Sequence, residues 1–274
     1  MQPPVVLSIA GSDPSGGAGI QADLKTFSAL GTYGTAALAG LTVQNTQGVR
    51  AAVAVDPGLV RNQIEAIIDD LPVAATKLGM LSNAAVASAV ADLLEERRDE
   101  FGLIVLDPVM VATSGDRLLT ADAIETIRVR LTRLADIVTP NLPEAAVLLG
   151  RGAAIATTAA DLEQQAAALV ESGARAALVK GGHLNDDVLT DVLASRDGVV
   201  RFTSPRIRTQ NTHGTGCTLS SAIAASAAKL GDTRETGVSR AAVNNARDYL
   251  HRAIVSGAGW RLSLSKPGVC PSTG

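Results

Sequence analysis

Short runs of apolar, often β-branched residues alternate along the chain with longer stretches rich in alanine and leucine. The runs Leu103–Leu106 and Ala176–Val179 are apolar at every position, which is typical of strands buried on both faces of a sheet. Alanine and leucine are strong helix formers, so the longer stretches are predicted to be helices. Strands that alternate with helices indicate βαβ units, and we therefore expect a parallel sheet covered by helices on both faces.

The predicted strands, in chain order, are Val5–Ala10, Thr35–Val43, Ala75–Met80, Gly102–Leu106, Asp136–Thr139, Ala176–Val179, Val188–Leu193 and Val199–Phe202. The predicted helices are Ile20–Leu30, Leu59–Asp70, Asn83–Arg98, Ala121–Leu134, Pro143–Leu149, Ala159–Glu171, Cys217–Lys229 and Ser239–Val255. The tail Ser263–Gly274 has no periodicity, and we expect it to be poorly ordered. One domain is expected over residues 1–262, because 274 residues is near the upper size that one hydrophobic core serves.

The composition narrows the class of protein. The formal net charge is −3 and aromatic residues make up only 2%, which argues against binding to a nucleic-acid backbone or stacking on its bases. No apolar run reaches the ~20 residues of a membrane helix, and the amino terminus lacks the cationic start of a secretory signal. The two cysteines are too few for a disulfide scaffold. We therefore predict a cytoplasmic protein with no nucleic-acid or membrane partner.

A glycine-rich turn, Gly11–Gly19, follows the first predicted strand and leads into a helix. Ligands of open parallel sheets bind beyond the carboxyl ends of the strands, and glycines let the backbone approach a ligand closely. The turn is not a Walker loop, because the chain has no Gly-Lys pair, and it does not read G-x-G-x-x-G. A ligand-binding turn and a merely flexible turn both remain possible at this point.

A second glycine-rich segment, Asn211–Leu219, opens the helix that begins near Cys217. Small residues leave several backbone N–H groups bare at this helix start, and together with the helix dipole they form an anion site suited to phosphate. Cys217 stands at the same positive end, where we expect the pKa of its thiol to fall below the usual ~8.5. The alternative is a buried structural cysteine in a glycine-rich cap.

Four polar residues follow predicted strands, where the topology places ligand-binding groups. Asp107 and Glu144 form a pair of carboxylates suited to Mg²⁺, although each could instead serve as a capping or first-turn residue. Lys180 could reach a transferring phosphoryl group, or simply extend to solvent. The amide of Gln44 could pair with the edge of an aminopyrimidine, or cap a turn.

Seven motifs then stand in a recognisable order. They are Gly16-Gly17-Ala18-Gly19-Ile20-Gln21-Ala22-Asp23, Val43-Gln44-Asn45-Thr46, Lys77-Leu78-Gly79-Met80, Asp107-Pro108-Val109-Met110, Thr139-Pro140-Asn141-Leu142-Pro143-Glu144, Lys180-Gly181-Gly182-His183 and Asn211-Thr212-His213-Gly214-Thr215-Gly216-Cys217. Together they resemble the hydroxymethylpyrimidine/phosphomethylpyrimidine kinases of thiamine biosynthesis, which belong to the ribokinase-like superfamily. The resemblance runs from about Val5 to about Arg252.

The resemblance implies a three-layer α/β/α sandwich with a central, mostly parallel sheet, assembled as a homodimer. It implies an enzyme that uses ATP and Mg²⁺ to phosphorylate 4-amino-5-hydroxymethyl-2-methylpyrimidine, and then to phosphorylate that monophosphate to the diphosphate. Carried over by motif, the substrate-binding residues are Gln44, Gly11, Ala18, Met80 and Val109. The residues at the ATP phosphates and the anion hole are Lys180, Gly214, Thr215 and Gly216, and the metal residues are Asp107 and Glu144. The catalytic residues that the resemblance implies are Cys217, in the place of the base, and Lys180. The resemblance assigns no role to Asp23.

The wider superfamily usually carries an aspartate where this chain has Cys217, and a cysteine there is typical of the pyrimidine-kinase branch. The first acceptor is an alcohol, whose proton a thiolate could remove. The second acceptor is already a phosphate, largely ionised because its second pKa is about 6. The second transfer therefore needs positioning and charge neutralisation rather than a base.

Three other functions fit parts of the pattern. A pyridoxal or pyridoxine kinase of the same superfamily shares the Gly-Thr-Gly-Cys turn, but pyridoxal lacks the edge that Gln44 would recognise. A cysteine hydrolase built on Cys217 and His213 lacks an evident orienting group. A non-catalytic pyrimidine-binding protein would leave the charges of Lys180, Asp107 and Glu144 without a role. A zinc site is not expected, because His183, His213 and His251 are too scattered.

Overall fold

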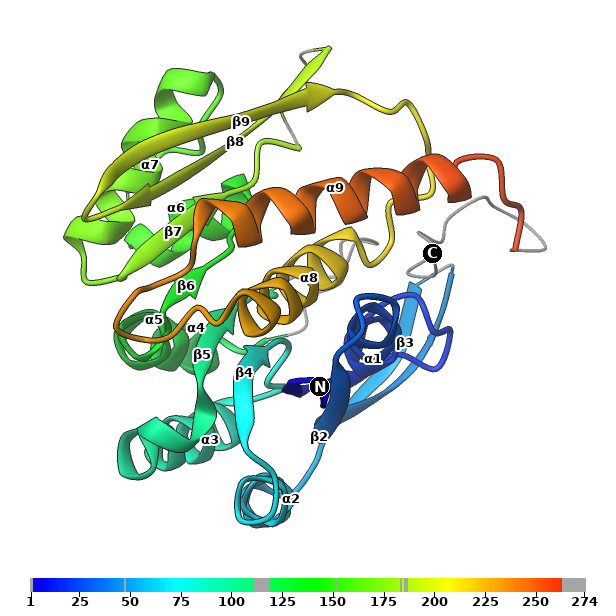
Figure 1. The fold of residues 1–274 in the computed structure, drawn as a ribbon, viewed down its shortest axis with the longest axis vertical. Coiled ribbons are helices and arrows are strands. Elements are labelled where there is room, and N and C mark those ends of the chain that lie inside the picture. Colours follow the sequence, from blue (N-terminus) through cyan, green and yellow to red (C-terminus); the bar gives the residue numbers. More distant parts are fainter. Residues whose placement is uncertain are drawn as a thin grey trace.

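The computed structural model describes residues 2–46, 48–110, 119–150, 152–182, 184 and 187–262. His183 and the tail Ser263–Gly274 lie outside the described residues, so the expected disorder of the tail stays a prediction. The strands of the described residues form one nine-stranded sheet in the order β3-β2-β1-β4-β5-β6-β7-β8-β9 (Figure 1). They are β1 Val5–Ser12, β2 Tyr33–Asn45, β3 Gly48–Ala54, β4 Val73–Leu78, β5 Leu103–Leu106, β6 Ile137–Val138, β7 Ala176–Val179, β8 Val188–Ser195 and β9 Gly198–Pro205.

The helices cover both faces of this sheet. They are α1 Gly19–Ala29, α2 Pro57–Ile68, α3 Ala84–Glu96, α4 Ala121–Thr126, α5 Thr132–Leu134, α6 Leu142–Leu149, α7 Ala159–Glu171, α8 Thr215–Leu230 and α9 Arg240–Gly257, with a 3₁₀ turn η1 at Arg98–Phe101 and a π-helical turn η2 at Ile127–Leu131. No helix within the described ranges is both long and apolar enough to cross a membrane. The expected α/β sandwich is therefore confirmed, with one predicted helix, Ala121–Leu134, interrupted by η2.

The sheet is mostly parallel rather than wholly so. Strands β1, β2, β4, β5, β6 and β7 run parallel, whereas β3, β8 and β9 pair antiparallel at the two edges. Strand β3 was not predicted, because Gly48–Ala54 is rich in alanine, contains an arginine and is largely exposed at the edge. Strand β2 continues to Asn45, so Gln44 lies within the strand and does not follow it as expected.

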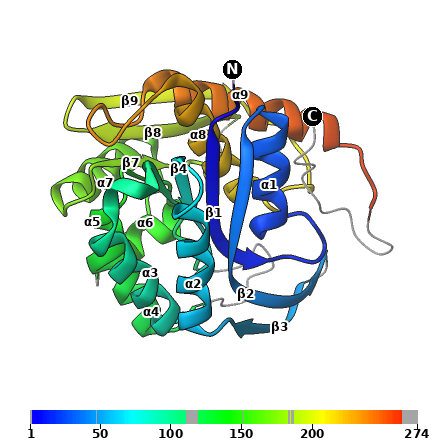
Figure 2. The same ribbon diagram turned by 60° about the horizontal axis from the view of Figure 1, so that its bottom comes forward.

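Alternating side chains of the central strands divide the core into two layers. In β1, which lies between β2 and β4 (Figure 2), Leu7 and Ile9 belong to one apolar cluster and Val6 to the other. The first cluster packs under α2, α3, α4, α6 and α7, and the second packs under α1, α8 and α9. The side chain of Ser8 shares the face of Val6 and therefore points toward α1 and α8.

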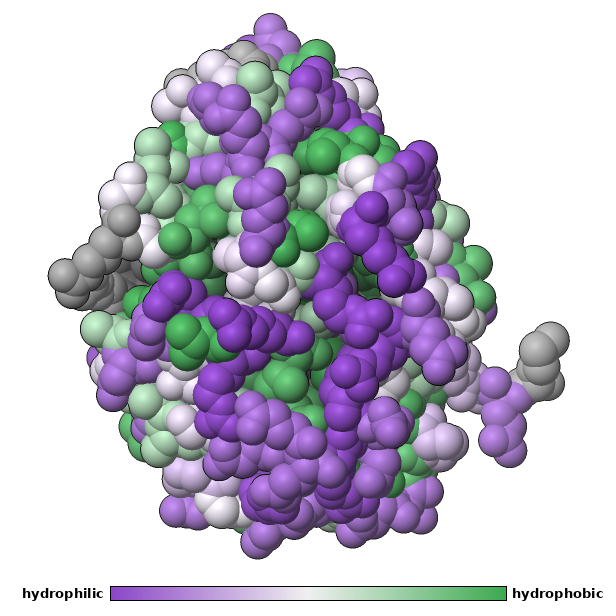
Figure 3. Space-filling view, turned by 90° about the vertical axis from the view of Figure 1, so that its left-hand side faces the viewer, coloured by the Kyte–Doolittle hydropathy of each residue, from purple (hydrophilic) through white to green (hydrophobic). Residues whose placement is uncertain are grey.

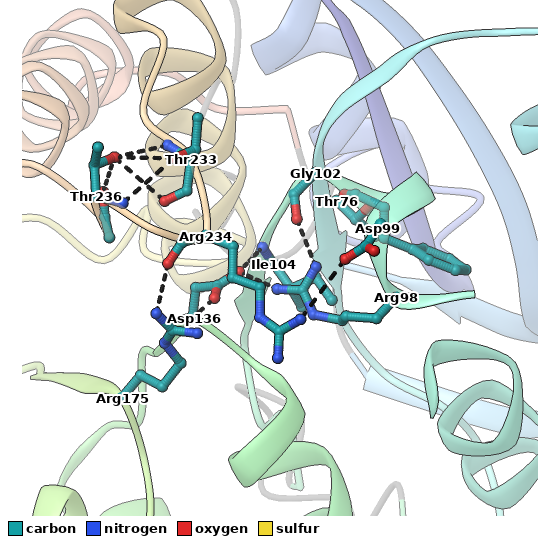
Figure 4. A network of polar contacts seen from close by, with 12 residues as sticks. Thr76, Arg98, Asp99, Gly102, Ile104, Asp136, Arg175, Thr233, Arg234 and Thr236 are labelled. Carbon is teal, nitrogen blue, oxygen red and sulfur yellow. Dashed lines mark hydrogen bonds and ion pairs between the residues drawn. The ribbon is translucent and has the colours of Figure 1, made fainter. Parts of the chain in front are cut away.

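At the amino ends of the parallel strands, which we call the amino edge of the sheet, a buried carboxylate, Asp136, precedes β6 and links neighbouring strands (Figure 4). It accepts a hydrogen bond from the N–H of Ile104 at 2.8 Å, forms an ion pair with Arg98, and has Oδ1 3.6 Å from Nε of Arg175. These contacts tie the starts of three neighbouring strands together. A hollow of about 760 Å³ opens here, lined in part by Arg98, Arg175 and Arg234. Hydrophilic residues gather across this side of the molecule, which faces the viewer in Figure 3.

Candidate active site

The polar residues that the topology singled out lie together at the opposite, carboxyl edge of the sheet. Asp107 directly follows β5, and its backbone N–H bonds to the carbonyl of Leu78 at the end of β4. Lys180 directly follows β7, and its N–H bonds to the carbonyl of Pro140 beyond β6. Backbone hydrogen bonds between neighbouring chain segments thus continue beyond the strands, and they fix the positions of the Asp107 and Lys180 backbones. The hollow at the amino edge does not border this region.

Lys180 and Asp107 form an ion pair at the start of α8. The ammonium Nζ of Lys180 lies 3.1 Å from Oδ1 of Asp107, and the hydroxyl of Ser220 donates to Oδ2 of Asp107 at 3.3 Å. A Cβ placed on Gly216 would lie 3.3 Å from Nζ of Lys180 and 3.5 Å from Oδ2 of Asp107. Burial acts to lower the pKa of Lys180, but Asp107 and Glu144 outweigh it and raise that pKa. The lysine therefore stays charged against the first turn of α8.

Glu144 lies in the first turn of α6, which is one of the two roles that its position suggested. Its Oε2 accepts from the N–H of Asn141 at 2.9 Å, and Oδ1 of Asn141 accepts from the N–H of Glu144 at 2.9 Å, which is a capping box on α6. The side chain is also buried, and burial raises the pKa of Glu144 to about 7, with Lys180 lowering it and Asp107 raising it further. The carboxylates of Asp107 and Glu144 therefore lie close enough to oppose each other's charge.

A cation between the two carboxylates would relieve this opposition. The donors are carboxylate oxygens, which Mg²⁺ prefers, and Mg²⁺ usually completes its shell with water and substrate phosphates. Among the residues that the structure describes, no group of three or more His, Cys, Asp or Glu side chains could form a protein-only metal cage. The donor set thus fits an ion that is shared with a bound nucleotide.

The two glycine-rich turns pack directly against each other. Gly214 has a left-handed backbone with φ +80°, and a Cβ there would overlap the carbonyl oxygen of Gly17 and lie 3.4 Å from Cα of Ala18. His213 places Nε2 2.8 Å from Oδ2 of Asp13, which also accepts from the N–H of Ala18 at 2.9 Å. A side chain at position 214 would therefore force the turns apart.

This pairing accounts for His213. Burial acts to raise the pKa of Asp13, but hydrogen bonds from His213 and Ser15 prevail and lower that pKa. Among the described residues, His213 makes no hydrogen bond to Cys217. Asp13 could orient the imidazole of His213, but without a contact between His213 and Cys217 the cysteine-hydrolase alternative has no base at its sulfur.

The residues predicted for the pyrimidine pocket gather beside the first turn. A Cβ on Gly11 would collide with the terminal methyl of Met80, so these two residues are in contact. The hydroxyl of Thr42 donates to the carbonyl of Ser12 at 2.8 Å and approaches Oε1 of Gln44 at 3.2 Å. The register of β2 against β3 shifts between Val43 and Gln44, and such a bulge re-aims a side chain.

Ala18 and Val109 complete this set in different ways. Ala18 is the residue before α1 and lies against Gly214, so it touches both turns. Val109 lies two residues beyond Asp107. It is half-buried and packs against the first of the two apolar clusters, the one that contains Leu7 and Ile9. The structure therefore brings Gln44, Gly11, Met80 and Ala18 to the first glycine turn, and places Val109 beyond the end of β5.

Cys217 is the third residue of α8 and is half-buried. Burial raises the pKa of its thiol to about 11; Lys77 and the N–H of Gly19 act to lower it, whereas Asp23 and Asp107 raise it. The expectation of a lowered pKa was therefore wrong. The positive end of α8 is present as predicted, but desolvation and two nearby carboxylates outweigh it.

Sequence reasoning missed an ion pair beneath this cysteine. The ammonium of Lys77 lies 3.0 Å and 2.9 Å from the two carboxylate oxygens of Asp23, and neither side chain is exposed to solvent. Both residues stood within the recognised motifs, and a lysine inside a buried strand was a usable signal, because buried charges need a partner.

Comparisons with known proteins show which family this chain resembles. A family model described as phosphomethylpyrimidine kinase matches residues 13–265. The hydroxymethylpyrimidine/phosphomethylpyrimidine kinase of Rhizobium meliloti is 51% identical over 251 residues, covering 91% of this chain and 90% of the relative. A crystal structure of phosphomethylpyrimidine kinase from Clostridium difficile matches with a TM-score of 0.77 and 36% identity, covering 92% of this chain and 99% of that one.

Pyridoxal kinases share the same fold. An ADP complex of Bacillus subtilis pyridoxal kinase matches with a TM-score of 0.84 and 31% identity, covering 98% of this chain and 97% of that chain. The sequence identity is thus higher to the pyrimidine-kinase relative, whereas the backbone is similar to both groups. The comparisons confirm the α/β fold class and the family that the motifs indicated.

Proposed function

The chain belongs to the phosphomethylpyrimidine kinase family, and from this premise we propose which residues carry its chemistry. It is a bifunctional hydroxymethylpyrimidine/phosphomethylpyrimidine kinase of thiamine biosynthesis. It transfers phosphate from ATP first to the hydroxymethyl group of 4-amino-5-hydroxymethyl-2-methylpyrimidine and then to the resulting monophosphate. The domain of residues 1–262 contains every residue proposed below.

One observation supports the placement of both substrates. The turn Gly214–Gly216 touches Ala18 on one side and the Lys180–Asp107 pair on the other. Ala18 belongs to the turn around which Gln44, Gly11 and Met80 gather, so the pyrimidine lies there. ATP phosphates lie on the side of Lys180, and the amides of the turn face the phosphoryl group in transit between the two. The N–H of Thr215 also donates to the carbonyl of Thr212 at 3.3 Å.

The charged residues neutralise the phosphates. Lys180 contacts the transferring phosphoryl group as a compact cation. Asp107 and Glu144 hold Mg²⁺, which when bound neutralises charge on the nucleotide phosphates. The backbone amides of Gly214, Thr215 and Gly216 form the anion hole at the start of α8. Val109 lines the far side of the pyrimidine pocket.

Cys217 acts as the base of the first transfer only. Its thiolate takes the proton of the substrate hydroxymethyl group as the alkoxide oxygen forms a bond to the γ-phosphorus of ATP and the bond to ADP breaks. The thiol then returns its proton to solvent. Because burial raises the pKa of Cys217 to about 11, the thiolate is scarce at neutral pH, and the first transfer is the step that depends on it.

The test of this function follows the two products separately. Purified protein, Mg²⁺ and ATP are incubated with the aminopyrimidine alcohol, and the monophosphate and diphosphate are quantified over time. We expect the monophosphate to appear first and then to be consumed. If pyridoxal is phosphorylated efficiently and the aminopyrimidine is not, the pyridoxal kinase alternative is correct and the assignment of Gln44 fails.

We also propose that the enzyme is a cytoplasmic homodimer. The β2–β3 ribbon exposes three apolar side chains at the edge of the sheet: Leu41 is 52% exposed, Val43 55% and Val53 62%. Apolar side chains gathered at one exposed edge are typical of an interaction surface, and a second copy of the chain would cover them. Sedimentation of the purified protein tests the dimer.

A further inference from the structure

A fully buried ion pair lies beneath Cys217, and the proposed mechanism does not use it. Lys77 projects from β4 and Asp23 from α1, and both side chains are completely shielded from solvent. Such a pair is costly to bury, and apolar residues of similar volume often give equal or greater stability. A contribution to folding alone is therefore a weak explanation for its presence here.

Asp23 connects three elements of the structure. Its carboxylate accepts hydrogen bonds from Ser8 of β1 at 2.6 Å and from Ser221 of α8 at 2.6 Å, in addition to the two from Lys77. No oxygen of the carboxylate is left without a donor. The packed helices α1 and α8 are thus joined to each other and to the middle of the sheet through one residue.

The helical spacing places this junction one turn below the cysteine. Residues four apart lie on the same face of a helix, so Ser221 lies on the face of Cys217, and Asp23 lies on the face of Gly19. Gly19, the first residue of α1, directs its N–H to the sulfur of Cys217. The first turns of α1 and α8 therefore meet at the sulfur, and their second turns meet at the carboxylate of Asp23.

Lys77 reaches the same level from the sheet. Its side chain extends along β4 toward the carboxyl edge, because a Cβ on Gly79 would lie 2.7 Å from the Lys77 ammonium and 2.9 Å from Cβ of Ala10. The charges that act on Cys217 come from every element packed around it: Lys77 from β4, Asp23 from α1 and Asp107 from beyond β5. Lys180, beyond β7, also interacts with Cys217.

We propose that the Lys77–Asp23 pair is a positioning element for the first phosphoryl transfer, which locks the start of α8 against the start of α1 and holds a buried ammonium beside the sulfur of Cys217. This rests on the proposed function, in which the thiolate of Cys217 is the base. When the thiolate forms, the ammonium of Lys77 and the Gly19 amide face the new negative charge. The second transfer has no such charge to accommodate on sulfur.

The main test removes both charges together, because removing one would leave the other buried and unpaired. The variant Lys77→Met/Asp23→Asn keeps an amide that can still bond to Ser8 and Ser221. Its matched control is Arg98→Met/Asp136→Asn, which removes a comparably buried pair at the opposite edge of the sheet. Both are made in a Cys270→Ser background, in which Cys217 is the one cysteine of the chain.

Two measurements are made on each variant. We expect Lys77→Met/Asp23→Asn to lower kcat of the first transfer by at least about tenfold while KM and the second transfer change by less than about threefold. Removing the pair removes two opposed influences on the pKa of Cys217, and the ammonium of Lys77 is the larger of them. We therefore expect the rate of alkylation of Cys217 by iodoacetamide at fixed pH to fall, because the thiolate is less populated. The control should change both transfers and the alkylation rate by less than about threefold.

A second variant keeps both charges. Ser221→Ala removes only the link from α8 to Asp23, and we expect it to slow the first transfer and the alkylation by about threefold, with the second transfer unchanged. The proposal is overturned if folded variants alkylate as fast as the parent, or if the two transfers fall together. Alkylation needs no turnover, so an effect on alkylation with no role of Cys217 in catalysis would remove the proposed base and leave the structural assignment of the pair standing.

Discussion

His213 and Asp13 are 200 positions apart in the chain, and their side chains meet with Nε2 and Oδ2 2.8 Å apart. This contact joins the turn proposed to bind the pyrimidine to the turn proposed to bind the phosphates. The carboxylate of Asp13 also accepts hydrogen bonds within its own turn, from the N–H groups of Ser15 and Ala18. The pair therefore sets the spacing between the two halves of the candidate site.

Substituting His213 with alanine should weaken substrate binding more than the chemistry. Loss of this contact would let the two turns move relative to each other, and misplacement of a bound substrate is costly, so we expect KM for the aminopyrimidine to rise about tenfold or more. The variant His213→Asn, which can still donate to Asp13, should recover much of the loss. Steady-state kinetics on the first transfer measures both. Equal KM values for the two variants would show that the hydrogen bond does not set the spacing.

Replacing Lys180 with methionine should reduce both transfers, because both pass a phosphoryl group along the same path. We expect kcat to fall about 10²-fold or more in each step, which is typical for loss of one transition-state charge contact. Lys229→Met is the control, since that lysine bonds to the carbonyl of Leu30 on the protein surface. A loss confined to one of the two steps would contradict the placement of Lys180 at the ATP phosphates.

The first transfer should accelerate as pH rises, and the second should not. A thiol with a pKa of about 11 is almost entirely protonated at neutral pH, and its thiolate fraction grows about tenfold for each pH unit below that value. We therefore expect kcat of the first step to rise steeply between about pH 7 and pH 9. In Cys217→Ala the first step should be slow and nearly independent of pH, with the second step close to the parent. Equal losses in both steps would point to a purely structural cysteine.

Magnesium should stabilise the protein more at alkaline than at acid pH. The pKa of Glu144 is raised to about 7 in the folded protein, above its ordinary value, so its contribution to stability is complete at low pH and is lost as pH rises through 7. A bound cation would offset that loss. We expect the gain in Tm from Mg²⁺ with a non-hydrolysable ATP analogue to be larger at pH 8 than at pH 6. In Glu144→Gln the gain should no longer depend on pH in this way; if it still does, Glu144 does not hold the ion.

A charge on the exposed edge of the β2–β3 ribbon should separate the proposed dimer. Val53 is 62% exposed, and a glutamate there would place a charge inside an apolar interface. We expect Val53→Glu to sediment as a monomer at concentrations where the parent is a dimer. Val255→Glu, at a similarly exposed position of α9 (55%), should leave the parent's assembly unchanged. A parent that sediments as a monomer removes the proposal directly.

The sequence was most informative where a polar residue follows a buried apolar run. Asp107 and Lys180 could be placed at the carboxyl edge because the runs before them predict strands, and strands of a parallel sheet end at one edge. Strand β3 escaped prediction because its side chains are mostly exposed and carry no alternating pattern. The π-helical turn in the segment Ala121–Leu134 could not be predicted, because its residues are as typical of a helix as those around it.

Contacts between distant segments could not be predicted from single motifs. The helix start at Cys217 was visible in the sequence, but the carboxylates of Asp23 and Asp107 that oppose its ionisation come from other elements. The prediction of a lowered pKa for Cys217 was therefore wrong. The pairing of His213 with Asp13 depends in the same way on how two turns pack, which neither turn encodes alone.

Asp136 and its arginine partners hold the sheet together at the end where no catalytic residue is proposed. Stabilising substitutions often reduce activity when they stiffen a reactive centre. Here the reinforcement and the chemistry occupy opposite ends of the same strands. Substitutions that raise heat tolerance should therefore be sought around Arg98 and Arg175, where we expect added rigidity to leave kcat unchanged.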